Sequence, residues 1–433
     1  MKLNNPNAEL YIPDGTDEKT ALSRTTDLCI AAHQDDIEIM AFAPAAKCYG
    51  KPDRWFTGVV VTDGAGSPRT GIYENYTDEE MKRVRIGEQK RAAAVGGYSA
   101  QFLLGYPSGA VKDPGDSGRA VSSELAAIID QCAPEILYVH NFADKHDTHV
   151  AVALRAAEAV RSERPEGGVI FNCVNNWPVT DVASAPQDAV YIEVWPPNDS
   201  YRDLYALVRE AKLLSGGKSV VLAAYLKPFE TGGEAAENAF RLAWAVISAS
   251  GGTQLVLGED RCALRDSYYV NHARLRDEFC PTVQKYCDFL VRYADLLYDD
   301  KGTDISRTAA GGINEDVCFS VESCEFSTDG AGGTVWSIIR ESRELISIQL
   351  INLRGNDARW NEPKSRPITV KGIKLCLRLD RPVRGIWWAS PDGESLGPVE
   401  LAHSWTNSEH GRVYTASLPP LDYWAAVWVR LGD

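Results

Sequence analysis

The chain has 433 residues, which is too long for one ordinary hydrophobic core, so two or three domains are expected. Its 45 basic and 60 acidic residues give a formal charge of −15, which argues against a surface for nucleic acid or for anionic membranes. A hydrophobic content of 44% with 24% charged residues is typical of a globular protein with a large interior.

The cysteines and the first residues indicate a cytoplasmic protein. The ten cysteines are scattered singly, as in DLCIAA and IKLCLRL, and no CxxC pair occurs. We therefore expect buried free thiols in a reducing compartment. The start, MKLNNPNAELYIPDG, lacks the apolar core of a signal peptide, and no segment is long enough for a membrane-spanning helix. The sequence leaves homo-oligomerisation open.

The first part of the chain alternates short apolar runs with amphipathic stretches. A helix is predicted from residue 77, where Thr77 and Glu80 form a capping box. Continuous apolar strands that alternate with helices predict an α/β fold with a Rossmann-like, doubly wound parallel sheet. The expected strands are 27–32, 55–62, 101–105, 135–140 and 168–174.

The second part continues this alternation and then changes character. DAVYIEVWPP and KSVVLAAYL read as strands, with helices at 200–214, from 234 and at 281–298. After a Gly/Thr/Asp-rich stretch, short alternating runs such as LISIQLINL and YWAAVWVRL predict a C-terminal antiparallel β-sandwich. We expect three domains: an α/β domain (1–167), a partial (β/α) barrel-like segment packed on or extending it (168–310), and the sandwich (311–433).

Polar residues follow the predicted strands of the first domain. In parallel sheets, ligands bind beyond the carboxyl ends of the strands, so these side chains are expected on one rim. They are His33, Asp35 and Asp36 after the first strand, Asp63 after the second, and His140, Asp144, His146 and His149 after the fourth.

Two of these clusters have the spacing of metal ligands. His33 and Asp36 are three residues apart across a strand-to-helix turn, and His146 and His149 are three apart at the start of a helix. A catalytic zinc site needs about three protein ligands and an open position, which a His–Asp–His set supplies. The alternative is that a strand-end aspartate such as Asp36 only caps a helix.

The motifs resemble the PIG-L (LmbE-like) deacetylases, zinc enzymes that remove N-acetyl groups from amino sugars. AAHQDDIEIMA resembles the AHPDDE signature of that family, VVVTDGAG and RIGEQKRAAA resemble its next segments, and HNFADKHDTHVAVALRAA resembles its HPDH motif. The resemblance covers residues 25–167. It implies that His33, Asp36 and His149 bind the metal and that Asp35 is the general base. It also implies that His146 polarises the carbonyl group or protonates the leaving amine.

The sequence departs from this family pattern at a few positions. Gln34 and Ile37 replace the usual proline and glutamate, and Thr148 stands where HPDH has an aspartate. Asp144 or Asp147 is a candidate substitute for that aspartate as the partner of the catalytic histidine.

Arg85, Asp113 and Asp144 are assigned to substrate binding. Arg85 matches the arginine that contacts substrate in the family, although an ion pair with Glu88 or Glu79 on the same helix is an equal alternative. Asp113 lies in the loop VKDPGD, where most aspartates only form turns.

The remainder, residues 169–433, resembles glycoside hydrolase family 66, the dextranases and cyclodextran-forming glucanotransferases. The segments YIEVWPPNDSYRDL, VVLAAYLKPFE and SIQLINLRGNDARWNEP carry this resemblance. It places Glu193 at the position of the general acid/base. A retaining glycosidase needs a second carboxylate about 5 Å away, and the deacetylase-like segment replaces the strand that carries it in the family. We therefore predict no glycosidase activity from Glu193 alone. The sequence leaves open whether the join near residue 167 is natural or engineered.

The sequence therefore predicts a metal-dependent deacetylase that acts on an amino sugar or a related glycoside. The expected cofactor is Zn²⁺, although a His–Asp–His set also accepts other divalent ions. The expected partner is a small-molecule carbohydrate substrate, with no nucleic acid and no membrane. Two alternatives remain: a non-catalytic carbohydrate-binding or chimeric scaffold protein, and a glycoside hydrolase that uses Glu193.

Overall fold

The chain folds into two compact units. The computed structural model describes residues 2–163, 165–166, 168–258, 260–266, 272–298, 302–309 and 316–432. The first unit comprises Met1–Phe171 with Ala185–Asp188, and the second comprises Asn172–Ser184 with Ala189–Asp433. The expected boundary at 310/311 lies outside the described residues, as does Gly167 beside the expected boundary at 167/168. The division into three domains stays a prediction.

The first unit is built on a mainly parallel sheet with the strand order β1-β4-β3-β2-β5. Strands β2 to β5 run parallel, and β1 pairs antiparallel with β4 at one edge. The chain adds β3 and β4 on one side of β2 and then adds β5 on the other side, so the strand order switches between β2 and β5. The strands are β1 (Glu9–Tyr11), β2 (Asp27–Ala31), β3 (Phe56–Thr62), β4 (Ala100–Tyr106) and β5 (Ile136–Val139).

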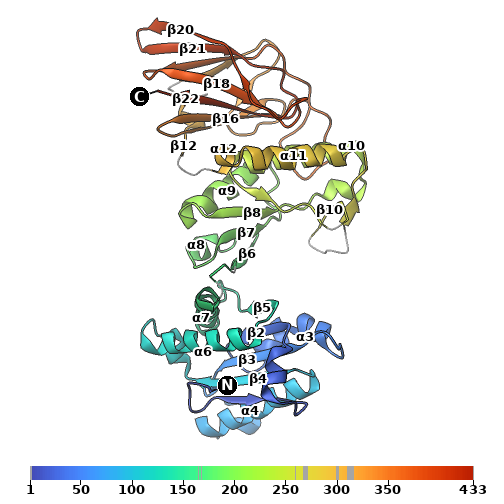
Figure 1. Cartoon of the computed structure of the whole chain (residues 1–433), viewed down its shortest axis with the longest axis vertical. Coiled ribbons are helices and arrows are strands. Elements are labelled where there is room, and N and C mark those ends of the chain that lie inside the picture. Colours follow the sequence, from blue (N-terminus) through green and yellow to red (C-terminus); the bar gives the residue numbers. More distant parts are fainter. Residues whose placement is uncertain are drawn as a thin grey trace. The chain divides into compact units, whose positions relative to one another are not determined.

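Helices cover both faces of this sheet (Figure 1). One face packs against α1 (Glu18–Ser23), α5 (Ser108–Lys112), α6 (Asp116–Cys132) and α7 (Asp147–Glu163). The other packs against α2 (Asp36–Met40), α3 (Phe42–Cys48) and α4 (Asp78–Val95). Because both faces are covered, the central strands β2 and β3 are buried along their whole length, as their continuous apolar runs predicted.

Helix α4 begins as predicted. The Thr77 side chain accepts a hydrogen bond from the Glu80 backbone N–H, and the Glu80 side chain accepts one from the Thr77 backbone N–H. This reciprocal arrangement satisfies two of the N–H groups that a helix start leaves unpaired. The predicted capping box is confirmed, and it fixes the helix that carries Arg85 and Gln89.

A buried ion pair holds the beginning of β2. The Asp27 side chain is fully buried and accepts hydrogen bonds from Arg54 (2.7 Å), from the Tyr138 hydroxyl (3.0 Å) and from the Thr26 hydroxyl (2.8 Å). Burial by itself would raise the pKa of Asp27, but the hydrogen bonds from Thr26, Arg54 and Tyr138 lower it below its ordinary value. The carboxylate therefore ties β2 to β5 and to the loop before β3.

The second unit begins with a further sheet, in the order β6-β7-β8-β9. Strand β6 falls in the segment 168–174 that the alternation pattern grouped with the first strands, but it joins this second sheet. β7 and β8 pair parallel, as do β8 and β9. Helix α10 (Gly233–Ala249) is buried almost all round because it contacts α9, β9 and β16. The other elements are β6 (Ile170–Val174), α8 (Val179–Val182), β7 (Ala189–Glu193), α9 (Tyr201–Ser215), β8 (Ser219–Ala223), β9 (Thr253–Gln254), β10 (Cys262–Leu264), β11 (His272–Arg274), α11 (Cys280–Arg292) and α12 (Ala294–Tyr298).

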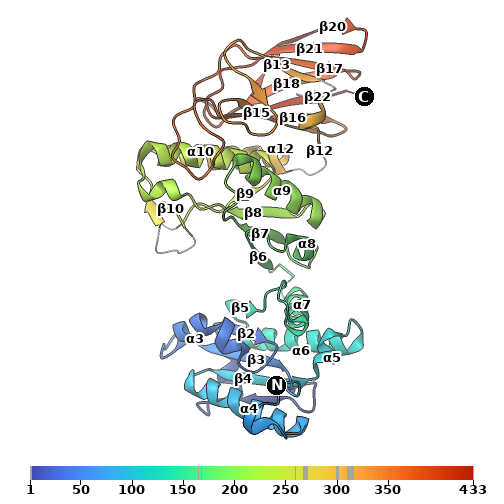
Figure 2. The same cartoon turned by 180° about the vertical axis from the view of Figure 1, so that it is seen from behind.

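The C-terminal part of the second unit is an antiparallel β-sandwich (Figure 2). One sheet has the order β12-β15-β16-β22-β18-β19, and the facing sheet has the order β13-β17-β21-β20. A core of apolar side chains from both sheets lies between them. A short strand, β14 (Phe326–Ser327), pairs parallel with β15 beside this order. The other strands are β12 (Thr303–Asp304), β13 (Val317–Ser320), β15 (Val335–Glu341), β16 (Leu345–Asn352), β17 (Lys374–Leu379), β18 (Val383–Ala389), β19 (Val399–Glu400), β20 (His403–Ser408), β21 (Gly411–Ser417) and β22 (Trp424–Leu431).

The fold class is therefore confirmed at the level of layered α/β units followed by an antiparallel sandwich. The finer classification as Rossmann-like and as a partial barrel stays a prediction. None of the described helices combines the length and the apolar composition that crossing a bilayer requires.

Candidate metal centre

The sheet of the first unit brings two segments that are far apart in sequence to the same rim. His33 follows β2 by two residues, and Asp36 is the first residue of α2. His149 lies in the first turn of α7, which follows β5. Because β2 and β5 are parallel neighbours, the segments after their carboxyl ends meet where the strand order switches.

The three predicted metal ligands converge on one point. Asp36 Oδ2 lies 3.2 Å from His33 Nδ1 and 3.4 Å from His149 Nε2, and the two ring nitrogens are 3.1 Å apart. Ligand atoms at typical Zn²⁺ distances in a tetrahedral site lie roughly 3.3–3.6 Å from one another, and the three separations here are within about 0.2 Å of that range. The donor set therefore fits a small divalent ion with one open position, in both chemistry and spacing.

His140 lies beside this site, but its Nε2 atom is hydrogen-bonded to the backbone. Its Nε2 lies 3.4 Å from Asp36 Oδ2, so Asp36, His140 and His149 form a second candidate ligand group. The same Nε2 atom accepts a hydrogen bond of 2.8 Å from the Ala32 backbone N–H. That bond occupies the Nε2 lone pair, which favours His33 over His140 as a ligand. The His140 ring stacks on the His149 ring, with centroids 4.0 Å apart, and so helps to hold it.

The charge on Asp36 is favoured by its surroundings. Burial opposes ionisation, but contacts with the His140 and His33 side chains and a 2.6 Å hydrogen bond from the His33 backbone N–H hold the pKa of Asp36 well below its usual range. Asp36 is therefore an ionised carboxylate across the whole physiological range, as a metal ligand must be.

Asp144 supports a metal-site histidine. Its Oδ2 atom accepts a hydrogen bond of 2.9 Å from His149 Nδ1, and its Oδ1 atom accepts one from the His146 backbone N–H. The bond to Nδ1 places the proton of His149 there and leaves Nε2 free to face Asp36 and His33. Asp144 thus contacts the predicted ligand His149, rather than the side chain of His146 for which the sequence offered it as a partner.

Asp147 forms an ion pair with Lys112 and no hydrogen bond with the His146 ring. Its carboxylate pairs with Lys112 at 2.9 Å, and its nearest approach to His146 Nδ1 is 3.8 Å, which is too long for a hydrogen bond. Thr148, at the position of the family's aspartate, is buried.

Asp35 combines an exposed carboxylate with a constrained backbone. Its side chain is 59% exposed, and its φ of 85° lies in the left-handed region, which costs of order 1–3 kcal/mol for a non-glycine residue. Two residues of α4 hold this conformation: Gln89 accepts a hydrogen bond from the Asp35 backbone N–H, and Arg85 binds the Asp35 carboxylate at 2.9 Å. The carboxylate is thereby presented at the rim instead of capping α2.

Arg85 forms the ion pair that was the alternative to its assignment to substrate binding. Its guanidinium group binds the Glu88 carboxylate at 2.7 Å. It also donates hydrogen bonds to the Asp35 carboxylate and to the Gln34 carbonyl group. These contacts place Arg85 beside the predicted general base. Its assignment to substrate binding stays a prediction.

His146 is the exposed histidine of the cluster. Its side chain is 51% exposed, and its ring stacks on His149 with centroids 4.5 Å apart and meets His33 edge-on at 4.9 Å. Partial burial, and then the neighbouring His149 and His33, lower the pKa of His146 below its ordinary value. A ring nitrogen of His146 lies within 4.8 Å of the ligand atoms of His33 and His149, so these three histidines form a further candidate ligand group.

Asp113 has the local role that its loop suggested as the alternative. Its carboxylate accepts hydrogen bonds from the backbone N–H groups of Gly115 and Ser117, where the chain turns into α6. These contacts account for Asp113 as a turn former, and its assignment to substrate binding stays a prediction.

Glu193 ends strand β7 in the second unit. Its Oε2 atom accepts a hydrogen bond of 3.1 Å from the side-chain amide of Asn172, and its backbone carbonyl group accepts one from the Asn175 N–H. The polar partner of this carboxylate is thus an amide on the preceding strand.

The residues that sequence reasoning left without a role are His140 and Gln89. His140 directly follows an apolar strand, in EILYVH. The same kind of strand-end position marked His33 as a candidate ligand. Gln89 lies on α4 one turn after Arg85, so helical spacing places both side chains on one face, and this spacing was the available signal.

Comparisons with known proteins assign the two parts of the chain to two families. The family model described as glycosyl hydrolase family 66 matches residues 154–428, more than half of the chain. The chain belongs to glycosyl hydrolase family 66. A second family model, described as GlcNAc-PI de-N-acetylase, matches residues 28–160 of this family 66 member, and that range contains the candidate metal centre. Both resemblances predicted from the sequence are confirmed.

The relatives of this family 66 member are considerably longer proteins. It is 28% identical over 197 residues to a cycloisomaltooligosaccharide glucanotransferase from Niallia circulans, which covers 45% of this chain and 20% of that protein. It is 22% identical over 312 residues to a dextranase from Streptococcus salivarius, which covers 60% of this chain and 37% of that protein. The chain therefore spans about a fifth to just over a third of these curated relatives.

A solved structure shares the fold. The crystal structure of a cycloisomaltooligosaccharide glucanotransferase from Paenibacillus sp., complexed with cycloisomaltoheptaose, matches with a TM-score of 0.63 and 16% sequence identity. The match covers 94% of this chain and 85% of that chain. At this level of identity the likeness concerns the fold alone.

Proposed function

We propose that the first unit is a metal-dependent hydrolase that removes an N-acetyl group from an amino sugar or a related glycoside. The observation that carries the proposal is the convergence of His33 Nδ1, Asp36 Oδ2 and His149 Nε2 within 3.4 Å of one another. The match of residues 28–160 to the de-N-acetylase family model supports the same chemistry. The carbohydrate family of the second part supports a sugar as the substrate class.

The metal would be held by His33, Asp36 and His149. Zn²⁺ is the proposed ion because two imidazoles, one carboxylate and an open position form a catalytic zinc donor set, although Fe²⁺ and Co²⁺ accept the same ligands. When bound, such an ion supplies Lewis acidity and favours the ionisation of a water molecule near neutral pH. Asp144 keeps the His149 ring in the orientation and tautomer that this coordination requires.

Asp35 is the proposed general base. Its carboxylate is exposed at the rim, directly before the metal-binding Asp36, and Arg85 fixes its orientation. A base in this place accepts a proton from the attacking water while Asp36 remains a ligand. A rigidly positioned base contributes about 10²–10⁴-fold to the rate of such a reaction.

His146 is the proposed partner of the substrate carbonyl group and of the leaving amine. It is half exposed, it stacks on His149, and Asp147 Oδ1 lies 3.8 Å from its Nδ1 atom, too far for a hydrogen bond. A neutral imidazole can donate its N–H to the developing oxyanion, and an imidazolium can protonate the amine as the C–N bond breaks.

A glycoside hydrolase that uses Glu193 is the second candidate, and the family 66 match favours it. A retaining mechanism requires a second carboxylate about 5–5.5 Å from the first. The structure gives Glu193 the amide of Asn172 as its polar partner, and an amide is not a nucleophile for this reaction. The deacetylase proposal therefore takes precedence.

The test is a metal analysis followed by an activity assay on the full chain. Protein purified without added metal should contain about one equivalent of a divalent ion, and should release free amine from N-acetylglucosamine derivatives. Chelation should abolish that release, and Zn²⁺ should restore it. A folded protein that takes up no metal and releases no amine in excess Zn²⁺ would instead favour the non-catalytic scaffold.

A further inference from the structure

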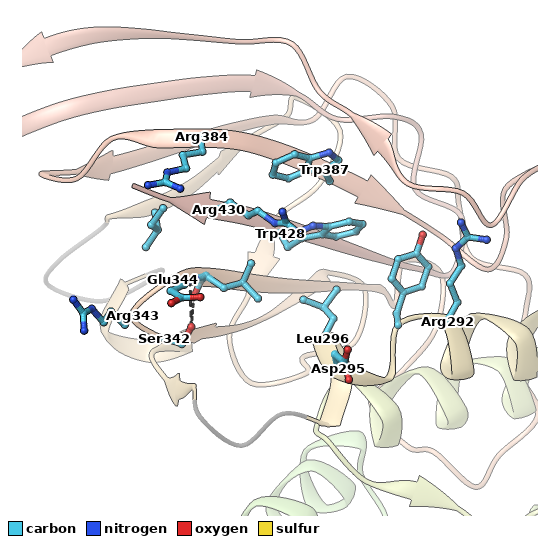
Figure 3. Close-up of a pocket in the computed structure, with 13 residues that line it drawn as sticks. Arg292, Asp295, Leu296, Ser342, Arg343, Glu344, Arg384, Trp387, Trp428 and Arg430 are labelled. Carbon is cyan, nitrogen blue, oxygen red and sulfur yellow. Dashed lines mark hydrogen bonds between the residues drawn. The ribbon is translucent and has the colours of Figure 1, made fainter. Parts of the chain in front are cut away.

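A groove in the second unit lies between the sandwich and the helices beside it (Figure 3). Its volume is about 1100 Å³, and its walls come from α11 and α12, the turn between β15 and β16, and strands β18 and β22. These segments are distant in sequence, so the fold alone assembles the groove. It is large enough for more than one sugar ring, since typical small-molecule sites measure about 300–1,000 Å³.

An aromatic platform lines the groove. Trp387 on β18 and Trp428 on β22 are directly opposite one another in the antiparallel pair, and their rings stack with centroids 6.3 Å apart and planes 15° apart. Tyr293 extends the platform, 5.5 Å from Trp428. The strand pleat explains the arrangement: the neighbouring residues Trp388 and Val427 point into the sandwich core, so Trp387 and Trp428 point out of it.

The groove carries a local positive charge in a chain with a formal charge of −15. Four arginines line it, against the two carboxylates Asp295 and Glu344. Among the described residues, no acidic side chain forms an ion pair with Arg292, Arg343 or Arg430. The guanidinium carbon of Arg430 lies 5.4 Å from the centre of the Trp387 ring. One planar donor is thus held beside the aromatic platform.

We propose that this groove binds an oligosaccharide that carries anionic groups. The partly exposed Trp387 indole, backed by the buried Trp428, suits the apolar face of a sugar ring, and the arginines suit a carboxylate or a phosphate, which a guanidinium group binds in a bidentate manner. The choice of a sugar as the ring rests on membership of a carbohydrate-acting family. The groove itself lies outside the metal centre and outside the surroundings of Glu193, so the proposal does not depend on deacetylation.

The experiment is isothermal titration of the full chain with four probes. Tetragalacturonate should bind with a dissociation constant on the order of 1 mM or tighter, and added salt should weaken the binding. Isomaltotetraose, a neutral probe of the same length, and inorganic phosphate, an anion without a ring, should each bind at least about tenfold more weakly. Tighter binding of glucose 6-phosphate than of tetragalacturonate would identify phosphate as the anionic group. Equal affinity for isomaltotetraose or for inorganic phosphate would overturn the proposal, as would a failure of both anionic sugars to bind.

Variants locate the binding. Trp387→Ala removes the exposed half of the platform, and Arg430→Gln removes a charge at the surface, where folding is least affected; each should weaken binding about tenfold. Arg430→Lys keeps the charge and should weaken it less. Trp405 and Arg412 provide matched controls, because this exposed pair, with the Arg412 guanidinium carbon 5.0 Å from the Trp405 ring, lies on the other sheet. Trp405→Ala and Arg412→Gln should bind as the unmodified chain does. Equal losses in both pairs would overturn the assignment to the groove.

Discussion

The strand ends of the two units carry different chemistry on similar layered frameworks. After β2 and β5 in the first unit, imidazole and carboxylate groups converge within 3.4 Å, and a second layer of contacts from Asp144, His140 and Ala32 holds them. At the end of β7 in the second unit, the Glu193 carboxylate accepts a hydrogen bond from the Asn172 amide, and it joins no cluster of histidines and carboxylates among the described residues. In both units, parallel strands place polar groups at one rim of a sheet. Within the part of the chain that the structure describes, only in the first unit do several such groups converge and receive hydrogen bonds that fix their orientation.

The comparison is tested most severely by removing a ligand. Asp36→Ala deletes the carboxylate that both ring nitrogens face, so we expect loss of bound metal and complete loss of amine release. Elemental analysis and the amine assay measure these. Asp63→Ala is the matched control, since Asp63 also follows a strand of this sheet but pairs with Lys82. Full metal content in Asp36→Ala would remove the proposed centre.

The next largest effect is expected from the proposed base. Asp35→Asn should lower the rate of amine release about 10²–10⁴-fold with the metal content unchanged, because Asp35 is exposed and is not one of the converging ligands. Asp147→Asn, an exposed carboxylate bound to Lys112, serves as the control and should keep its rate. A parallel loss of metal in Asp35→Asn would reassign Asp35 to metal binding.

Asp144 tests whether the supporting contacts matter. Asp144→Asn weakens the acceptor for His149 Nδ1, so metal affinity should fall about 10–100-fold while the fold persists. Competition with a chelator measures the affinity without using activity. Asp113→Asn, which changes a turn carboxylate in the same unit, should leave the affinity unchanged. An unchanged metal affinity in Asp144→Asn would show that Asp144 does not support the metal ligand His149.

The buried pair at the start of β2 predicts a pH dependence of stability. The pKa of Asp27 is lower in the folded chain than in the unfolded chain, where it is about 3.9. Its contribution is therefore complete above that value and is lost as the pH falls through the lower folded-state value. Asp27→Asn should cost about 1–3 kcal/mol near neutral pH and less in acid. Urea unfolding at several pH values measures this difference, and a constant difference would contradict it.

The smallest effect is expected in the second unit. Glu193→Gln should change neither metal content nor amine release, and the unmodified chain should release no reducing sugar from dextran. If the unmodified chain releases reducing sugar and Glu193→Gln does not, then Glu193 is catalytic and the second unit also carries an active site.

The sequence by itself determined which segments carry the chemistry. Apolar periodicity located β2 to β5, the polar residues after them marked the rim, and two motif resemblances assigned the two parts to their families. The sequence also predicted the Thr77–Glu80 capping box. These features are local, because strand burial, helix starts and short motifs depend on residues a few positions apart. They can therefore be predicted from the sequence alone.

Only the tertiary structure decided which atoms face one another. It committed the His140 lone pair to Ala32, turned Asp144 toward His149 rather than His146, and placed β6 in the second sheet. It also built the Trp387–Trp428 groove from segments on separate helices and strands. The physical reason is that ring orientation, hydrogen-bond partners and strand pairing depend on tertiary contacts, and two of those at the metal centre join residues more than 100 positions apart. Spacing along the chain does not reveal such contacts.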